Sequence, residues 1–143
     1  MNGNKTLGIG QILELTAQKK TTAEKVQFLR DNFSGTLADI LIFAYHPQVK
    51  FLLPDGVPPY TPNDVANQEH MLFREVRKIP NLIDHPDNKL TQFQREKIYI
   101  DILQNVSPRD ALLLIAIKDR EAPYGIDESI IREAFPDLLP PKE

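Results

Sequence analysis

The residues in this sequence with the clearest chemical potential are basic side chains at the ends of predicted helices. One cluster, Lys19-Lys20-Thr21, precedes a helix start, and another, Lys118-Asp119-Arg120, leads into Tyr124-Gly125. A third lies between Arg74 and Lys78. Free backbone N–H groups beside Lys or Arg favour phosphate binding. Cations at a helix C-terminus also complement the helix dipole, so a purely structural interpretation stays open.

Motifs for catalysis or metal binding are absent from the sequence. There is no glycine-rich phosphate loop ending in Gly-Lys-Ser/Thr and no Gly-x-Ser-x-Gly elbow, and the histidines lack ligand spacing. Asp55-Gly56 would suit nucleotidyl transfer only with a lysine two residues before the Asp, where Leu53 stands, so a Pro-Asp-Gly turn is the better interpretation. We expect no enzymatic activity, no metal, no cofactor and no small-molecule substrate.

Length and charge set further limits. The 143 residues fit a single domain, 1–143, and the absence of cysteine excludes disulfides. The net charge of −3 weighs against strong non-specific binding of nucleic acid. No apolar stretch follows the N-terminus as in a signal peptide, and the longest apolar run, Ala111–Ile117, is too short to span a membrane. We therefore expect a cytoplasmic protein without a membrane partner.

Helix-start signals recur along the chain and predict an all-α, compact bundle of about seven helices. Capping boxes and Ser, Thr or Asp caps precede apolar residues at helical spacing, and no alternating run predicts a sheet. The helix after Ser107 is apolar nearly all round, so we expect it at the centre, with Leu113, Ile115 and Ile117 buried. The expected helices are Leu7–Gln18, Thr22–Asn32, Gly35–Tyr45, Pro62–Lys78, Thr91–Asn105, Ser107–Asp119 and Glu128–Phe135, with Ile79–Asn88 as a connector.

The second half of the chain carries a resemblance to a known family. Lys118-Asp119-Arg120-Glu121, then Gly125, then Phe135-Pro136-Asp137-Leu138-Leu139-Pro140 follow the long apolar helix. This pattern resembles the end of the N-terminal DNA-binding domain of T-even-phage-type ATP-dependent DNA ligases, which has Arg-Asp-Leu, a glycine and then Trp-Pro-Gly-Leu-Ile-Pro. The order of elements is similar from about Ile9 to Pro140. The resemblance implies a stand-alone, phage-encoded, all-α domain that contacts the DNA minor groove, because the sequence ends at Glu143, where the ligase catalytic domain would begin.

The loop that should approach DNA departs from the ligase pattern. The arginine of the family is Lys118 here, its leucine is Arg120, and Ala122-Pro123-Tyr124 inserts extra residues before Gly125. Lysine keeps the charge of arginine but cannot form the bidentate hydrogen bonds that a guanidinium makes to a phosphate.

Two loops are predicted to contact DNA. The resemblance places Lys118, Arg120, Tyr124 and Gly125 against the backbone of duplex DNA. The helix-start loop, with Lys19, Lys20 and Thr21, is predicted to supply the second set of contacts.

Two functions follow from the sequence. The first is a non-enzymatic phage accessory protein that binds duplex DNA through backbone and minor-groove contacts in DNA replication or repair. The alternative is a protein-interaction module of the same fold that binds a phage or host protein, such as a replication protein. A continuous basic face across both loops would favour DNA, whereas an acidic surface with an exposed apolar patch would favour a protein partner.

Overall fold

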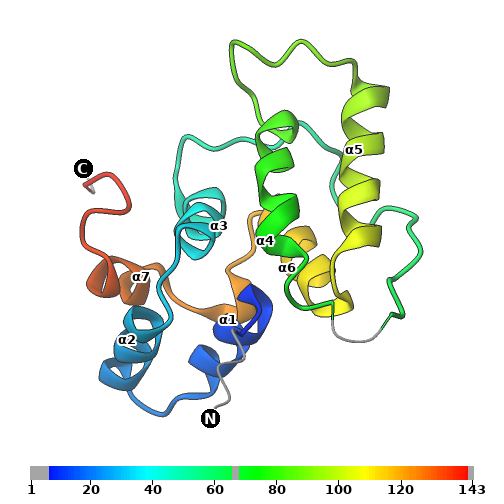
Figure 1. The fold of residues 1–143 in the computed structure, drawn as a ribbon. Coiled ribbons are helices and arrows are strands. Elements are labelled where there is room, and N and C mark those ends of the chain that lie inside the picture. Colours follow the sequence, from blue (N-terminus) through cyan, green and yellow to red (C-terminus); the bar gives the residue numbers. More distant parts are fainter. Residues whose placement is uncertain (1–6, 66–67, 142–143) are drawn as a thin grey trace.

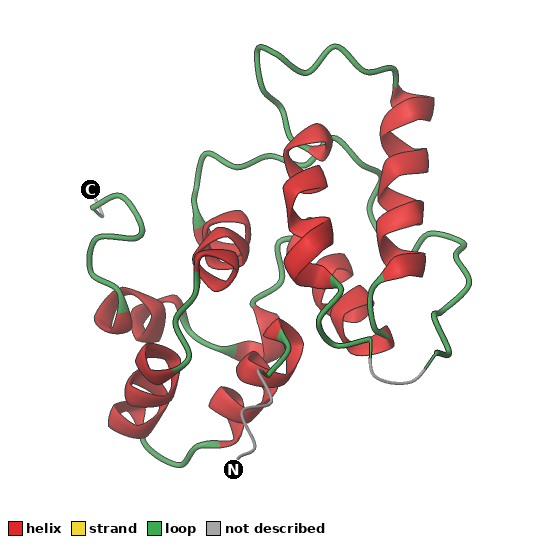
Figure 2. Cartoon of the chain, in the orientation of Figure 1, coloured by secondary structure: helices red, strands yellow, loops and turns green. Residues whose placement is uncertain are grey.

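The computed structural model describes residues 7–65 and 68–141. Within these residues the chain forms seven α-helices and two short 3-10 helices, and no strand (Figures 1 and 2). The predicted all-α bundle of about seven helices is thereby confirmed. The elements are α1 (Ile9–Gln18), α2 (Thr22–Asp31), α3 (Gly35–Tyr45), α4 (Leu72–Glu75), η1 (Val76–Leu82), α5 (Gln92–Asn105), α6 (Pro108–Lys118), η2 (Pro123–Gly125) and α7 (Glu128–Ala134).

Side-chain caps explain where most of these helices begin. In each case a side-chain oxygen of the capping residue accepts a hydrogen bond from a backbone N–H in the first turn of the helix. Such a bond satisfies one of the donors that a helix start leaves free. The sequence signals for these starts were therefore correct. The capping residues are Thr21, Ser34, Thr91, Ser107 and Asp127.

The predicted helix from Pro62 to Lys78 is wrong at both ends. Residues 61–65 are not helical, because their polar groups bond elsewhere: the Thr61 N–H donates to the Gln104 side chain (2.9 Å) and the Asn63 amide to the Asn105 carbonyl (3.1 Å). The helix begins only at Leu72. It then continues as the 3-10 helix η1 to Leu82, into the segment that was expected to be a connector.

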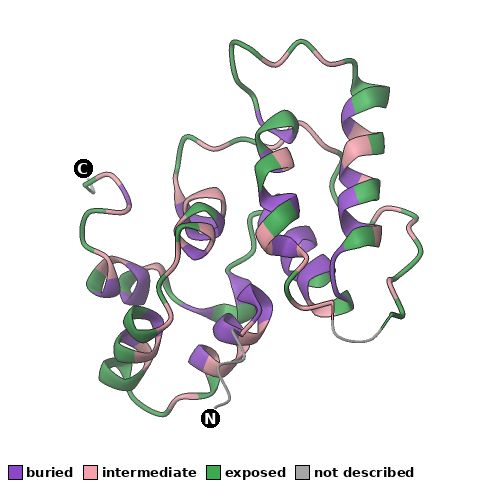
Figure 3. Ribbon diagram, viewed as in Figure 1, coloured by how far each residue is buried: buried purple, intermediate pink, exposed green. Residues whose placement is uncertain are grey.

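Helix α6 joins two groups of helices. Helices α1, α2 and α7 pack together on one side, whereas η1 and α5 pack together on the other (Figure 1). Helix α6 contacts α1 and α3 as well as α5, which gives it the central place that its composition predicted. Leu113, Ile115 and Ile117 are buried, as expected. Figure 3 shows where buried and exposed segments lie along the ribbon.

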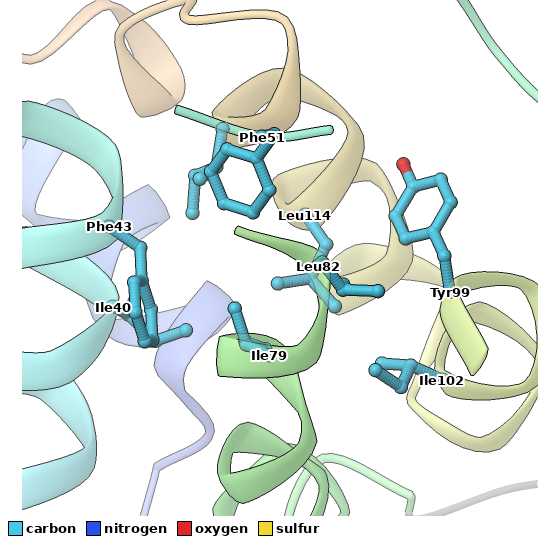
Figure 4. A pocket seen from close by; sticks show the side chains of 9 residues that line it. Ile40, Phe43, Phe51, Ile79, Leu82, Tyr99, Ile102 and Leu114 are labelled. Carbon is cyan, nitrogen blue, oxygen red and sulfur yellow. The ribbon is translucent and has the colours of Figure 1, made fainter. Parts of the chain in front are cut away.

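Helices α3, η1, α5 and α6 meet in an apolar core that the segment 49–53 closes. Phe51 forms an isolated antiparallel bridge with Ile83, and the Leu52 N–H donates to the Leu82 carbonyl at 2.8 Å. Side chains from α3, η1, α5 and α6 meet here around a cavity of about 10 Å³ (Figure 4). A space of that size holds about one water molecule, so it is a packing gap and not a ligand site. The lining residues are Ile40, Phe43, Phe51, Ile79, Leu82, Tyr99, Ile102, Leu114 and Ile117.

Candidate functional site

Lys118, predicted to meet DNA, is buried inside the protein. Its side chain is 2% exposed, and its Nζ donates to the carbonyls of Pro54 (2.8 Å) and Gly56 (2.9 Å). The same ammonium pairs with the carboxylate of Asp119. Because a buried charge must be paired and hydrogen-bonded, these acceptors explain why a lysine is tolerated here. In this structure Lys118 presents almost no surface to a phosphate.

The same pair of residues holds the loop at Pro54 in place. The Gly56 N–H donates to both carboxylate oxygens of Asp119, each at 3.3 Å. Gly56 has a φ of +89°, a left-handed conformation that glycine adopts without strain, as expected for the Pro-Asp-Gly turn. Lys118 and Asp119 therefore act as a clamp on residues 54–56, and their charges serve the fold.

Arg120 also binds main-chain carbonyls of the protein. Its two terminal nitrogens donate to the Phe43 carbonyl (2.9 Å) and the His46 carbonyl (2.8 Å), at the C-terminal end of α3. A guanidinium at this position satisfies carbonyls that the helix end leaves free. The backbone of Arg120 has a φ of +61°, which costs a non-glycine residue energy. DNA contact through Lys118 and Arg120 stays a prediction that these internal bonds do not support.

The other predicted DNA loop joins α1 to α2. The Nζ of Lys19 lies 4.6 Å from the centre of the Phe28 ring, a cation–π contact. The Thr21 hydroxyl accepts from the Glu24 N–H (3.1 Å) and is the cap of α2. Lys20 is exposed and makes no hydrogen bond or ion pair within the described residues. Of the three predicted contacts, Lys20 is the one with a free charge.

Tyr124 and Gly125 form a left-handed turn at the surface. Gly125 has a φ of +72° and Tyr124 a φ of +53°. A non-glycine residue in this region stores strain of about 1–3 kcal/mol, and such strain often accompanies function. The Tyr124 side chain is 38% exposed and lies near α1 and the N-terminal half of α6. The structure thus separates Tyr124 from Lys118, which bonds to the loop at Pro54.

Tyr124 borders an open hollow that the sequence did not indicate. The hollow has a volume of about 310 Å³ and lies between α1, α6 and η2. Leu112, on the otherwise largely buried helix α6, is 62% exposed at this hollow. Large apolar groups are thus open to solvent beside charged ones. The lining residues are Glu14, Arg109, Leu112, Leu113, Ala116, Pro123 and Tyr124.

A charged network holds Arg109 at the edge of the hollow. Its Nη1 donates to Glu69 Oε1 at 2.9 Å, and its Nε lies 3.4 Å from Glu14 Oε1. The second oxygen of Glu69 accepts from the Ser107 hydroxyl at 2.9 Å. Partners on two sides fix the guanidinium, so little side-chain entropy would be lost when a ligand covers it.

Two glycines let α1 lie close to this network. The Gly10 N–H donates to Asp110 Oδ1 at 2.9 Å, and a Cβ at Gly10 would lie only 2.5 Å from that oxygen. A Cβ at Gly8 would similarly lie 2.7 Å from the Glu69 carbonyl oxygen. A side chain at Gly10 would push α1 away from α6, and one at Gly8 would push it away from Glu69. The close approach of the two helices therefore depends on glycine.

Asp110 is the buried member of the network. It has no solvent exposure, and its Oδ2 has no hydrogen-bond partner within the described residues. Burial raises the pKa of Asp110 from 3.8 to about 7, opposed mainly by the hydrogen bond from Gly10. The carboxyl is therefore partly neutral at neutral pH. Its hydrogen bond from Gly10 joins α1 to α6, and residues of both helices line the hollow.

The groups that face solvent in the hollow suit binding. Burial, and then the charge of Glu14, raises the pKa of the Tyr124 hydroxyl to about 12, so it stays a neutral hydrogen-bond donor. Among the residues that the structure describes, no cluster of three or more His, Asp or Glu side chains could hold a metal ion. The site offers apolar surface, the Tyr124 hydroxyl, the Arg109 guanidinium and the Glu14 carboxylate. Aromatic and arginine side chains are enriched at protein interfaces.

A family model matches residues 12–123, which is most of the chain. The chain belongs to the DUF6433 family, a family of unknown function. The DUF6433 match includes Glu14, Arg109 and Leu112, and Tyr124 lies one residue beyond it. No curated protein matches the sequence. The description of DUF6433 names no activity, so the resemblance to the ligase domain stays a prediction.

Within the described part of the chain, no helix is long and apolar enough to cross a membrane.

Sequence reasoning missed most of the hollow in this DUF6433 protein. Glu14, Glu69 and Arg109 are distant along the chain, and only the packing of α1 on α6 brings them together. Ser107 to Asp110 was interpreted as a helix start and nothing more. One signal was available. A helix that is apolar nearly all round leaves an apolar side chain, here Leu112, at the surface wherever the fold does not cover it.

Proposed function

We propose that this protein is a non-enzymatic interaction module that binds a partner protein at the hollow between α1, α6 and η2. The observation that carries the proposal is the exposed Leu112 beside Tyr124, next to an Arg109 already held by Glu69. Apolar surface rimmed by polar groups is typical of interaction sites. Tyr and Arg are the side chains that most often dominate binding energy, especially when they are held in place.

Charge placement makes a protein partner the better-supported choice. Binding to DNA rests on cations that can reach phosphates. In the two predicted loops, Lys118 and Arg120 bind internal carbonyls and Lys19 lies over Phe28. Of the lysines and arginines predicted to contact DNA in these loops, this leaves Lys20 with a free charge, in a protein whose net charge is −3.

Site-specific photocrosslinking in cells that produce the protein tests the interaction. A photoreactive amino acid replaces Leu112, and in a control protein it replaces Phe93, which is 78% exposed on α5, outside the hollow. We expect a discrete protein adduct from position 112 that is missing from position 93. Equal adduct patterns at both positions would contradict the proposal, because they would reflect exposure alone.

Duplex DNA binding is the second candidate, and one observation favours it. Gly125 has a positive φ, and no atom lies within 4 Å of the place where its Cβ would be, so a nucleic-acid backbone can come close there. Lys20 adds a free charge in the other loop. Fluorescence anisotropy with nicked and intact duplex at two salt concentrations tests this function. Binding that weakens in salt and in Lys20→Ala would support it, and an absence of binding at low salt would exclude it.

A further inference from the structure

The hollow at Leu112 continues along α1 into a second one. This second hollow has a volume of about 150 Å³, and it shares Glu14 and Arg109 with the first. Leu7, Gln11 and Leu15 complete its lining. The Glu14–Arg109 ion pair therefore lies between two partly apolar depressions, and we call the two together the α1–α6 groove. A groove along a helix suits a linear segment, since such segments bind through side chains placed at intervals.

The charge of the groove is negative. Glu14 and Glu69 share the single guanidinium of Arg109, and the shorter contact, 2.9 Å, goes to Glu69. Within the described part of the chain, the Glu14 carboxylate is left with one ion-pair contact, 3.4 Å to Arg109, and its side chain is 40% exposed. Among the residues that the structure describes, no lysine and no second arginine lines either hollow. At the Tyr124 hydroxyl, Glu14 raises the pKa more than Arg109 lowers it, so the negative charge prevails.

Building on the proposed function, we propose that the α1–α6 groove binds a linear segment of the partner in which a lysine or arginine lies next to a large apolar side chain. The apolar side chain lies between Leu112 and Tyr124, where both neighbours lose solvent contact. The cation pairs with Glu14, whose charge is only partly compensated. The Arg109–Glu69 pair stays intact in the complex and keeps the wall of the groove in place.

Charge complementarity selects this occupant over the others. An acidic segment or the phosphates of DNA would place negative charge beside Glu14, and like charges in contact weaken association. A second copy of this chain would also bring a net charge of −3. A segment with apolar side chains alone would bury Glu14 with only its 3.4 Å contact to Arg109, and burying a charge that is only weakly paired is unfavourable.

Selection from a displayed random-peptide library tests the proposal with the full chain. Peptides are selected on the wild-type protein and depleted on the double variant Leu112→Ala with Tyr124→Asn, since asparagine tolerates a left-handed backbone. Circular dichroism confirms that each variant is folded. We expect the surviving peptides to carry Lys or Arg beside a large apolar residue.

Charge reversal then tests the role of Glu14. Glu14→Lys should weaken the selected peptides by about tenfold or more, and a fresh selection on this variant should favour Asp or Glu. Asp101→Lys, the same charge change at an exposed position on α5, should leave affinity and selected sequences unchanged.

The possible outcomes separate this inference from the proposed function. Peptides that depend on Leu112 and Tyr124 but carry no basic residue, or are indifferent to Glu14→Lys, would overturn the inferred partner class and leave the interaction surface standing. If selection yields no peptide that depends on Leu112 and Tyr124, both the inference and the proposed function are wrong.

Discussion

The two ends of α6 carry similar charged residues and use them differently. At the C-terminal end, Lys118 and Arg120 bind backbone carbonyls of the loop at Pro54 and of α3. At the N-terminal end, Arg109 binds the side chains of Glu69 and Glu14 at the rim of an open hollow. In the sequence both ends are simply charged helix termini. The difference lies in the acceptors: carbonyl acceptors tie segments of the fold together, whereas the acidic side chains leave charge and apolar surface open to a partner.

Removal of the Lys118 ammonium should have the largest effect on stability. Lys118→Met removes the donor of the Pro54 and Gly56 carbonyls and leaves the Asp119 carboxylate without its ion-pair partner. Breaking a buried ion pair costs about 3–5 kcal/mol, and we expect a loss of that size in the free energy of unfolding by urea denaturation. Lys20→Met, at an exposed and unpaired lysine, is the control and should change stability by less than about 0.5 kcal/mol. Equal effects of the two variants would remove the distinction between a structural and a free lysine.

The pH dependence of stability should reveal Asp110 at the other end of α6. Its pKa is about 7 in the folded protein and 3.8 ordinarily, so between these pH values the folded state holds a proton that the unfolded state has lost. This group therefore stabilises the fold most at low pH, and its contribution falls as pH rises from about 4 to 7, by up to about 4 kcal/mol. Asp110→Asn keeps an acceptor for the Gly10 N–H but does not titrate.

Urea denaturation of the wild-type protein and of Asp110→Asn, at pH 5 and at pH 8, isolates the contribution of Asp110 to the free energy of unfolding. Relative to Asp110→Asn, the wild-type protein should lose stability between the two values. A difference that does not change with pH would show that the carboxyl is ionised throughout this range.

Arg120 should contribute less than Lys118, because its guanidinium is exposed. Arg120→Ala removes both hydrogen bonds to the end of α3 and should cost about 1–2 kcal/mol. Arg120→Gly removes the same bonds but relieves the strain at the φ of +61°, so its cost should be about 1 kcal/mol smaller. Melting temperatures of the two variants, measured side by side, test this order. A glycine variant less stable than the alanine variant would contradict the strain assigned to this residue.

The smallest effect on stability is expected at Leu112. Because this side chain is largely exposed, Leu112→Ala should change the free energy of unfolding by less than about 0.5 kcal/mol. The neighbouring Leu113→Ala, at a buried position, should cost about 2–5 kcal/mol. A large loss from Leu112→Ala would mean that Leu112 stabilises the fold and that its surface is not kept free for a partner.

Local signals in the sequence predicted the fold better than the site. Thr21, Ser34 and Ser107 mark helix starts because a cap acts on the backbone within three residues, and such short-range chemistry is visible in sequence. The start predicted at Pro62 failed because residues 61–65 bond to the end of α5, some forty positions away. The same limit applies to the site. The sequence does not show that the Lys118 ammonium donates to the Pro54 carbonyl, or that Arg109 pairs with Glu14 and Glu69, because these partners are distant along the chain.

The packing of α1 on α6 also affects how the chain folds during synthesis. The hydrogen bond between Gly10 and Asp110 joins residues 100 positions apart, and the Arg30 side chain binds the carbonyl of Ala134, 104 positions away. At about 5–20 residues per second, a ribosome needs roughly 5–20 s to make the residues between such partners. Throughout that interval the apolar faces of α1 and α2 lack the helices that cover them in the finished protein. We therefore expect the faces of α1 and α2 that pack on α6 and α7 to stay exposed until the C-terminal helices have been made.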